Sequence, residues 1–186
     1  MRPNWFFAFP LDGRFVLELP ELPPSFRRYH PDDVHLTLSF LGGCTEEAAL
    51  RALAALDVAL ATSTFPCISV ALGEVVPMGP SGRYSALSAL LSQGREQTER
   101  CIASLRDVVS EAALGKRERR APKAHVTLAR PGRQATPARR EEGLAWAAAQ
   151  DLSAITAELR RIALYTWHED RRERLFRIVA ERPLGD

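Results

Sequence analysis

Two short segments of this chain repeat one pattern, His-x-Thr-x, at an interval of ninety positions. They read His35-Leu36-Thr37-Leu38 and His125-Val126-Thr127-Leu128. Alternate side chains of a β-strand share a face, so each histidine should project with its own threonine while the intervening hydrophobic residues face the core. Two such strands in matching hydrophobic frames predict two related halves, each presenting one imidazole and one hydroxyl.

The same alternation makes predictions about the rest of each strand. It places Phe40 on the core side together with Leu36 and Leu38. It places Arg130 on the face opposite His125, unless Pro131-Gly132 bends the strand and brings its side chain round. If the two halves pack about a pseudo-twofold axis, both imidazoles and both hydroxyls face each other across a cleft.

The remaining sequence predicts a mixture of strands and helices. The 186 residues, 46% of them hydrophobic, are enough for a buried core, and we expect residues 1–186 to form a single domain of two lobes. Hydrophobic patterning predicts strands over 4–9, 14–19, 34–41, 66–76, 83–90, 155–167 and 174–181. Helices are predicted after an N-cap at Thr45, over 93–114, and from Pro137 to about Gln150. Without a regular βαβ alternation the pattern favours α+β, with two pseudo-symmetric antiparallel sheets, outer helices and a central cleft.

Positive charge is concentrated around the second motif. The whole chain carries +2, yet residues 115–140 contain nine Lys and Arg against Glu118 alone, so this segment carries +8 and the remainder −6. Such a field attracts polyanions, of which nucleic acid is the commonest in a cytoplasm, although a solvated surface loop has the same composition.

Paired imidazoles suit acid–base chemistry near neutral pH, because a neutral ring accepts a proton and a protonated ring donates one. At a phosphodiester the two threonine hydroxyls would bind the non-bridging oxygens. No Asp or Glu lies inside either motif, so we expect no metal and no other cofactor. Three scattered cysteines, no long apolar run and no signal-peptide pattern favour a cytoplasmic protein without a membrane span.

The extended motifs, His35-Leu36-Thr37-Leu38-Ser39-Phe40 and His125-Val126-Thr127-Leu128-Ala129-Arg130, resemble the signature of the two-histidine (2H) phosphoesterase superfamily. Within it they are most similar to the bacterial and archaeal RNA 2′,3′-cyclic phosphodiesterases, also called 2′-5′ RNA ligases. The aromatic segment Phe6-Phe7-Ala8-Phe9 and the segment Tyr165-Thr166-Trp167 are similar to that family as well.

The resemblance implies a bilobal α+β fold and hydrolysis of a 2′,3′-cyclic phosphate at an RNA end to a 2′-phosphate. It implies that His35 is the acid, that His125 is the base, and that Thr37 and Thr127 hold the phosphate. Arg130 would contact the phosphate or stack on the terminal base, the alternative being a surface cation at a strand end. The expected partner is RNA with cyclic phosphate ends, tRNA fragments included, and the expected state is a monomer.

Three alternatives stay open at this point. The same site run in reverse is a 2′-5′ RNA ligase, with a 5′-hydroxyl in place of water. A phosphodiesterase for a small cyclic nucleotide would use the same four side chains. A non-catalytic RNA-binding module would have no need of a matched imidazole pair.

Overall fold

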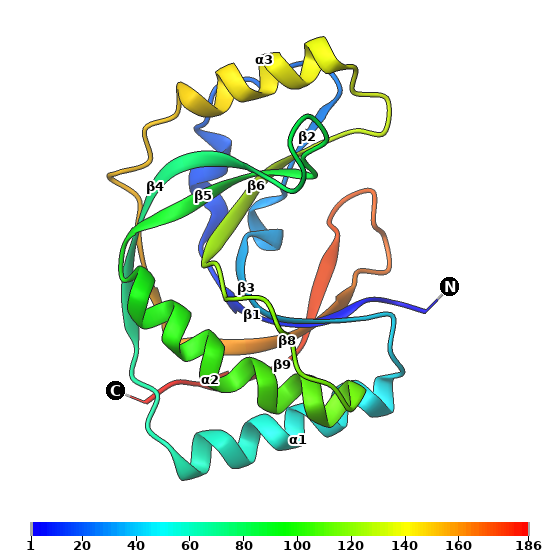
Figure 1. The fold of residues 1–186 in the computed structure, drawn as a ribbon, viewed down its shortest axis with the longest axis vertical. Helices are drawn as coiled ribbons and strands as arrows, with labels where there is room; N and C mark the ends of the chain where they lie inside the picture. The colour runs from blue at the N-terminus through cyan, green and yellow to red at the C-terminus, as the bar shows by residue number, and fades with distance from the viewer. Residues whose placement is uncertain (1, 186) are drawn as a thin grey trace.

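The computed structural model describes residues 2–185, which form a nine-stranded sheet with three α-helices (Figure 1). The strands are β1 (Trp5–Pro10), β2 (Phe26–Arg28), β3 (His35–Gly42), β4 (Ile68–Met78), β5 (Ala86–Gln93), β6 (His125–Pro131), β7 (Thr156–Leu159), β8 (Arg161–Trp167) and β9 (Phe176–Pro183). The helices are α1 (Glu46–Thr62), α2 (Arg95–Leu114) and α3 (Pro137–Ala148). The predicted α+β class is confirmed.

The sheet divides into two halves of four strands each. The strand order is β7-β4-β5-β6-β3-β1-β8-β9, every paired neighbour is antiparallel, and the short β2 pairs with β6 outside this path. The two predicted sheets therefore join into one curled sheet where β3 meets β6. These two strands are the motif strands, so the repeat in the sequence lies at the centre of the fold.

The helices cover the outer surface of each half and leave the inner surface free. In Figure 1 α3 lies above the half that contains β4, β5 and β6, while α1 and α2 lie below the half that contains β1, β3, β8 and β9. Among residues 2–185, no helix combines the length and the apolar character that a bilayer crossing requires.

Local sequence sets the helix boundaries. The Thr45 side chain accepts a hydrogen bond from the Ala48 amide at 3.2 Å, and Glu46 and Glu47 occupy the first turn of α1, as predicted. Thr136 caps α3 in the same way, with Pro137 in the first turn. The chain turns from β5 into α2 at Gly94, whose φ of 71° and close approach to the Ser69 carbonyl leave no room for a Cβ.

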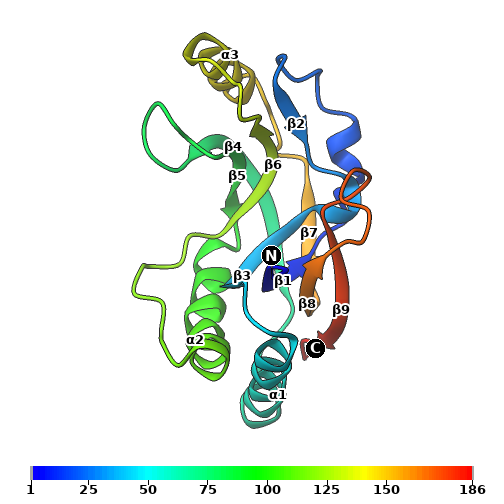
Figure 2. The same ribbon diagram turned by 90° about the vertical axis from the view of Figure 1, so that its right-hand side faces the viewer.

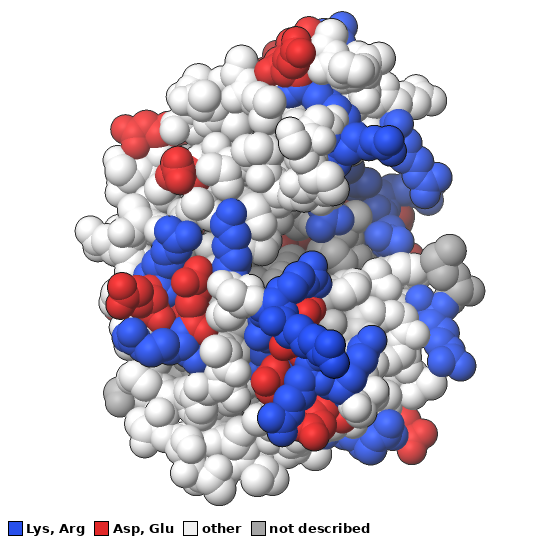
Figure 3. All heavy atoms as spheres, viewed as in Figure 1, with Lys and Arg blue, Asp and Glu red and all other residues white. Residues whose placement is uncertain are grey.

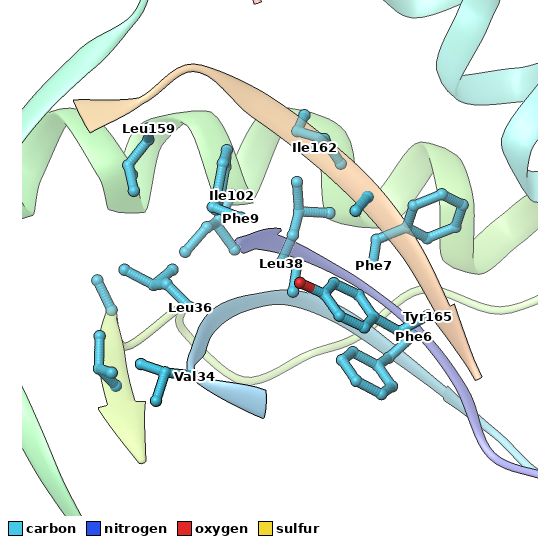
Figure 4. Close-up of a cluster of buried hydrophobic side chains, with 14 of the residues drawn as sticks. Phe6, Phe7, Phe9, Val34, Leu36, Leu38, Ile102, Leu159, Ile162 and Tyr165 are labelled. Carbon is cyan, nitrogen blue, oxygen red and sulfur yellow. The ribbon is translucent and has the colours of Figure 1, made fainter. Parts of the chain in front are cut away.

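The core lies between the sheet and the helices. Leu36 and Leu38 from the first motif are buried with Phe7, Phe9 and Ile102 (Figure 4). Burying side chains of this size contributes about 1.5–3 kcal/mol each, which fixes the motif strand so that its polar side chains face away from the helices.

Two expectations about the elements need correction, and one strand was not expected. Residues 14–19 do not form a strand: Gly13–Leu17 is a 3₁₀ helix, which begins because the Asp12 carboxylate accepts a hydrogen bond from the Arg14 amide. The predicted strand over 155–167 is two strands, since β7 pairs with β4 in one half and β8 pairs with β1 in the other. The short β2 was not predicted because three residues are too few to show a hydrophobic period.

Candidate active site

The pairing of β3 with β6 brings the two motifs together. Leu36 pairs with Val126, and both side chains are fully buried in the core. Extending this antiparallel register by one residue each way places His35 opposite Thr127 and Thr37 opposite His125. Because neighbours in a strand project to opposite faces, all four motif side chains lie on the inner face of the sheet. All four are half-buried, as expected for a cleft wall.

Each motif strand contains a β-bulge directly after its threonine. In β3 the pairing with β1 changes from Ala8–Thr37 to Phe7–Ser39, so one extra residue enters at Leu38. In β6 the pairing with β5 changes from Ser88–Thr127 to Leu87–Ala129, so one extra residue enters at Leu128. An extra residue reverses the alternation of faces beyond it.

The bulge in β3 makes the prediction for Phe40 wrong. Ser39 takes the core position, where its hydroxyl lies 2.9 Å from the Ser110 hydroxyl of α2. Phe40 turns to the inner face instead, and 61% of its surface is exposed. Strict alternation could not show this reversal, because a bulge leaves no clear trace in the hydrophobic pattern.

The bulge in β6 brings Arg130 to the face of His125 and Thr127. Ala129 is buried in its place, and the Arg130 guanidinium lies over the Tyr29 ring, 5.3 Å from the ring centroid. The Tyr29 and His35 rings are themselves 6.4 Å apart. Arg130 therefore reaches the surroundings of His35 without any bend at Pro131-Gly132.

Both imidazoles are held by backbone carbonyls in the same way. The Nδ1 atom of His35 lies 2.7 Å from the carbonyl oxygen of Asp33, and the Nδ1 atom of His125 lies 2.7 Å from that of Lys123. A carbonyl only accepts, so each Nδ1 carries the proton and donates it. This arrangement leaves Nε2 of each ring free to exchange a proton with a substrate.

His35 sits in an aromatic pocket. Its ring centroid lies 4.9 Å from that of Phe6, 5.5 Å from that of Tyr165 and 5.7 Å from that of Phe176. Phe6 in turn stacks on Tyr165, and Figure 4 shows these two rings side by side. Removal from water, assisted by the positive charges of Arg130 and of His125 when protonated, lowers the pKa of His35 to about 4.

His125 lies in a more polar setting. Burial is again the largest influence and lowers its pKa, and the charge of Lys123 lowers that pKa further. Both rings are thus neutral at pH 7 in the free protein, and an anion bound between them would favour protonation of either.

Ser88 is a site residue that sequence reasoning missed. It pairs with Thr127 across β5 and β6, is fully buried, and its hydroxyl lies 3.2 Å from the Thr127 hydroxyl. In the other half Ala8 pairs with Thr37, so that threonine has no matching hydroxyl on the neighbouring strand. An isolated serine in a hydrophobic strand gives no signal of this contact.

Asp33 fixes the segment that carries His35. Its buried carboxylate accepts hydrogen bonds from the Leu175 amide at 2.6 Å and the Phe176 amide at 3.0 Å, while its carbonyl orients the His35 ring. One residue therefore ties the first motif to the start of β9. Within residues 2–185 no three His, Cys, Asp or Glu side chains gather into a set that would ligate a metal.

A hollow opens between the two halves, and Lys and Arg side chains lie around it (Figure 3). The segment 115–124, which leads from α2 to His125, supplies five of the basic residues and one acidic residue. The site thus combines two neutral imidazoles, the two threonine hydroxyls and a positive rim, which is a set suited to a phosphate group.

No protein-family model matches the sequence, and no curated protein sequence matches it. Solved structures do match. E. coli LigT in complex with 3′-AMP is 18% identical, with 100% of both chains covered and a TM-score of 0.70. TT0787 of Thermus thermophilus is 19% identical, with 97% of both chains covered and a TM-score of 0.72.

A more distant match is Kluyveromyces marxianus Usb1, at 13% identity with a TM-score of 0.56, covering 99% of this chain and 97% of that one. Identities this low establish the fold. The bilobal α+β fold that the resemblance to the 2H phosphoesterases implied is confirmed, and the chain has the fold of LigT.

Proposed function

We propose that this protein is a 2H phosphoesterase that hydrolyses the 2′,3′-cyclic phosphate at an RNA end to a 2′-phosphate. The observation that carries the proposal is the register of β3 and β6, which sets each motif histidine opposite the threonine of the other motif. Two imidazoles with free Nε2 atoms and two hydroxyls on one face form a complete acid–base and phosphate-binding set.

In the proposed reaction a water oxygen attacks phosphorus while one imidazole takes the water proton. The bond from phosphorus to the ribose 3′ oxygen breaks, and the other imidazole gives its proton to that oxygen. Thr37 and Thr127 donate hydrogen bonds to the non-bridging oxygens, which gain charge in the transition state. The product keeps its phosphate on the 2′ oxygen, and the two histidines end with their protonation states exchanged.

The surroundings of the two rings favour His35 as the base and His125 as the acid. A base must be neutral when water is bound, and the pKa of about 4 keeps His35 neutral throughout the physiological range. His125 lies outside the aromatic pocket, so its protonated form is easier to reach than that of His35 when a phosphate is bound between the two rings. The resemblance implies the opposite assignment, so the roles need a direct test.

RNA is the proposed partner because of the charge around the cleft. The basic segment 115–140 surrounds the second motif, and Arg130 reaches the surroundings of His35. Structures of E. coli LigT hold 3′-AMP, ATP and phosphate, which supports the proposal that this chain binds a nucleotide phosphate. Both motifs come from one chain, so the proposed working form is a monomer in the cytoplasm.

The test uses a short RNA that ends in a 2′,3′-cyclic phosphate, in buffer containing EDTA. The wild-type protein should form a 2′-phosphate, identified by mass and by its sensitivity to phosphatase. His35→Ala and His125→Ala should each abolish that product. If the wild type leaves the RNA unchanged, the proposed reaction is wrong; turnover of a small cyclic nucleotide or joining to a 5′-hydroxyl RNA would then identify the true activity.

A further inference from the structure

We propose that a groove beside the catalytic cleft binds the RNA strand that continues 5′ from the terminal nucleotide, with a base stacked on Phe40 and phosphates on Lys116 and Arg119. This inference rests on the proposed function and adds a substrate preference to it: an oligonucleotide over a mononucleotide. None of the four motif residues forms the wall of this groove.

The groove has a volume of about 1100 Å³ and runs between the end of β3 and the segment 115–124. One wall is the edge of β3 at Phe40, Leu41 and Gly42. This edge is open because β3 pairs with β6 only at Leu36. The other wall is residues 116–119, and Asp107, Ser110 and Leu114 of α2 line the groove between the two walls. A space of this size accommodates more than a single side chain or ion.

Phe40 connects the groove to the catalytic cleft. The bulge at Leu38 turns its ring to the face that carries His35 and Thr37, three residues beyond that threonine. The Phe40 ring is 61% exposed, and base stacking on an exposed aromatic ring stabilises single-stranded nucleic acid. Its position suits the nucleotide next to the terminal one.

The opposite wall supplies positive charge. Arg117 pairs with Glu111, and Arg120 pairs with Glu118. Among residues 2–185, by contrast, no ion pair is formed by Lys116 or Arg119, so both cations remain available for phosphate. An aromatic ring on one wall and unpaired cations on the other are the two components of single-strand recognition.

A contact between the two halves lies on the side of the cleft away from the groove. The Arg27 guanidinium of β2 donates to the carbonyl oxygens of Arg172 at 3.1 Å and Arg171 at 3.4 Å, in the connection between β8 and β9. Figure 2 shows this connection and the segment 115–124 on opposite sides of the molecule. In the proposal, a strand whose end lies at the histidines leaves along the groove, on the side of the molecule opposite this contact.

The experiment compares two substrates, adenosine 2′,3′-cyclic phosphate and a hexanucleotide with the same cyclic end. Phe40→Ala should raise KM for the hexanucleotide roughly tenfold and leave KM for the mononucleotide unchanged, because only the longer substrate reaches the ring. Phe40→Trp should restore the wild-type value, while Phe40→Leu should not, since leucine offers no flat face.

A binding measurement separates the groove from the chemistry. By fluorescence anisotropy, a hexanucleotide with a plain 3′-hydroxyl should bind Phe40→Ala and Arg119→Ala more weakly than the wild type. Arg119→Ala should also reduce the slope of log K against log salt by about 0.7, the loss of one phosphate contact. Leu17→Ala, 68% exposed, and Arg100→Ala on α2 are controls that lie outside the groove and should bind as wild type.

The proposal would be overturned if Phe40→Ala changed KM equally for both substrates. It would also be overturned if Phe40→Ala and Arg119→Ala bound the plain hexanucleotide as tightly as the wild type. A wild type that hydrolyses neither substrate refutes the proposed function. In that case the groove would still be supported if the plain hexanucleotide bound to the wild type and bound more weakly to the two groove variants.

Discussion

The two halves of the molecule carry the same motif in different surroundings. In one, Phe6, Tyr165 and Phe176 enclose His35 at ring separations of 4.9–5.7 Å. In the other, His125 lies beside Lys123 and the basic segment, and its threonine contacts the Ser88 hydroxyl. A repeated backbone therefore fixes where the imidazoles lie, while the side chains around them decide how readily each takes a proton. In the proposed reaction, this difference would divide the roles of acid and base between the two members of the pair.

The largest effect is expected at the two histidines. His35→Ala and His125→Ala should each reduce kcat for the cyclic substrate by at least about a thousandfold, because each removes one proton transfer. The double variant should be hardly slower than either single variant, since the pair acts as a unit. Single-turnover hydrolysis with circular dichroism as a folding control measures this. If the double variant lost as much activity as the two single losses combined, the two histidines would not act as a unit.

The next largest loss of activity is expected at the two motif threonines. Thr37→Val and Thr127→Val should each lower kcat by about a hundredfold through loss of a hydrogen bond to the transition state. Ser88→Ala should lower kcat several-fold with little change in KM, because Ser88 positions the Thr127 hydroxyl but does not contact substrate. The matched comparison is Ala8→Ser, which places a hydroxyl next to Thr37 at the position that Ser88 occupies next to Thr127. If Ser88→Ala lowered the stability of the protein but left kcat unchanged, Ser88 would stabilise the fold without positioning Thr127 for the reaction.

The aromatic pocket should also appear in the pH dependence of stability. The pKa of His35 is about 4 in the folded protein and 6.5 ordinarily, so the unfolded chain binds the proton first as pH falls. The stabilisation is complete above pH 6.5 and is lost between pH 6.5 and 4, by up to about 3 kcal/mol. Urea unfolding of the wild type and His35→Phe should diverge over this range. If the unfolding free energies of the two proteins changed in parallel with pH, His35 would not be desolvated in the folded protein.

The smallest effect is expected from Arg130. Its charge contributes to the low pKa of His35, so Arg130→Gln should raise that pKa slightly. NMR titration of the imidazole carbon resonances follows both rings at once, and the His125 titration serves as the internal reference. A larger change in the pKa of His125 than in that of His35 would show that Arg130 acts on the second motif and not on the first.

The sequence predicted the centre of this molecule better than its edges. The repeated motifs identified the strands that meet at the junction, because hydrophobic alternation holds from His35 to Leu38 and from His125 to Leu128. Strict alternation placed Phe40 and Arg130 on the wrong faces, since each position depends on a bulge that only cross-strand register reveals. The expectation that Arg130 lies at the site came from the family resemblance. Ser88 was missed for a related reason: its role comes from a partner thirty-nine residues away.

The division of roles between the halves is tested most directly by changing the leaving group. Hydrolysis of the cyclic phosphate RNA is compared with hydrolysis of bis(p-nitrophenyl) phosphate, whose departing phenolate needs no proton. His125→Ala should lose activity on the RNA but keep most of its activity on the aryl ester, whereas His35→Ala should lose activity on both substrates. Retention of aryl ester activity by His35→Ala instead, with its loss in His125→Ala, would reverse the assignment and contradict the role given to the aromatic pocket.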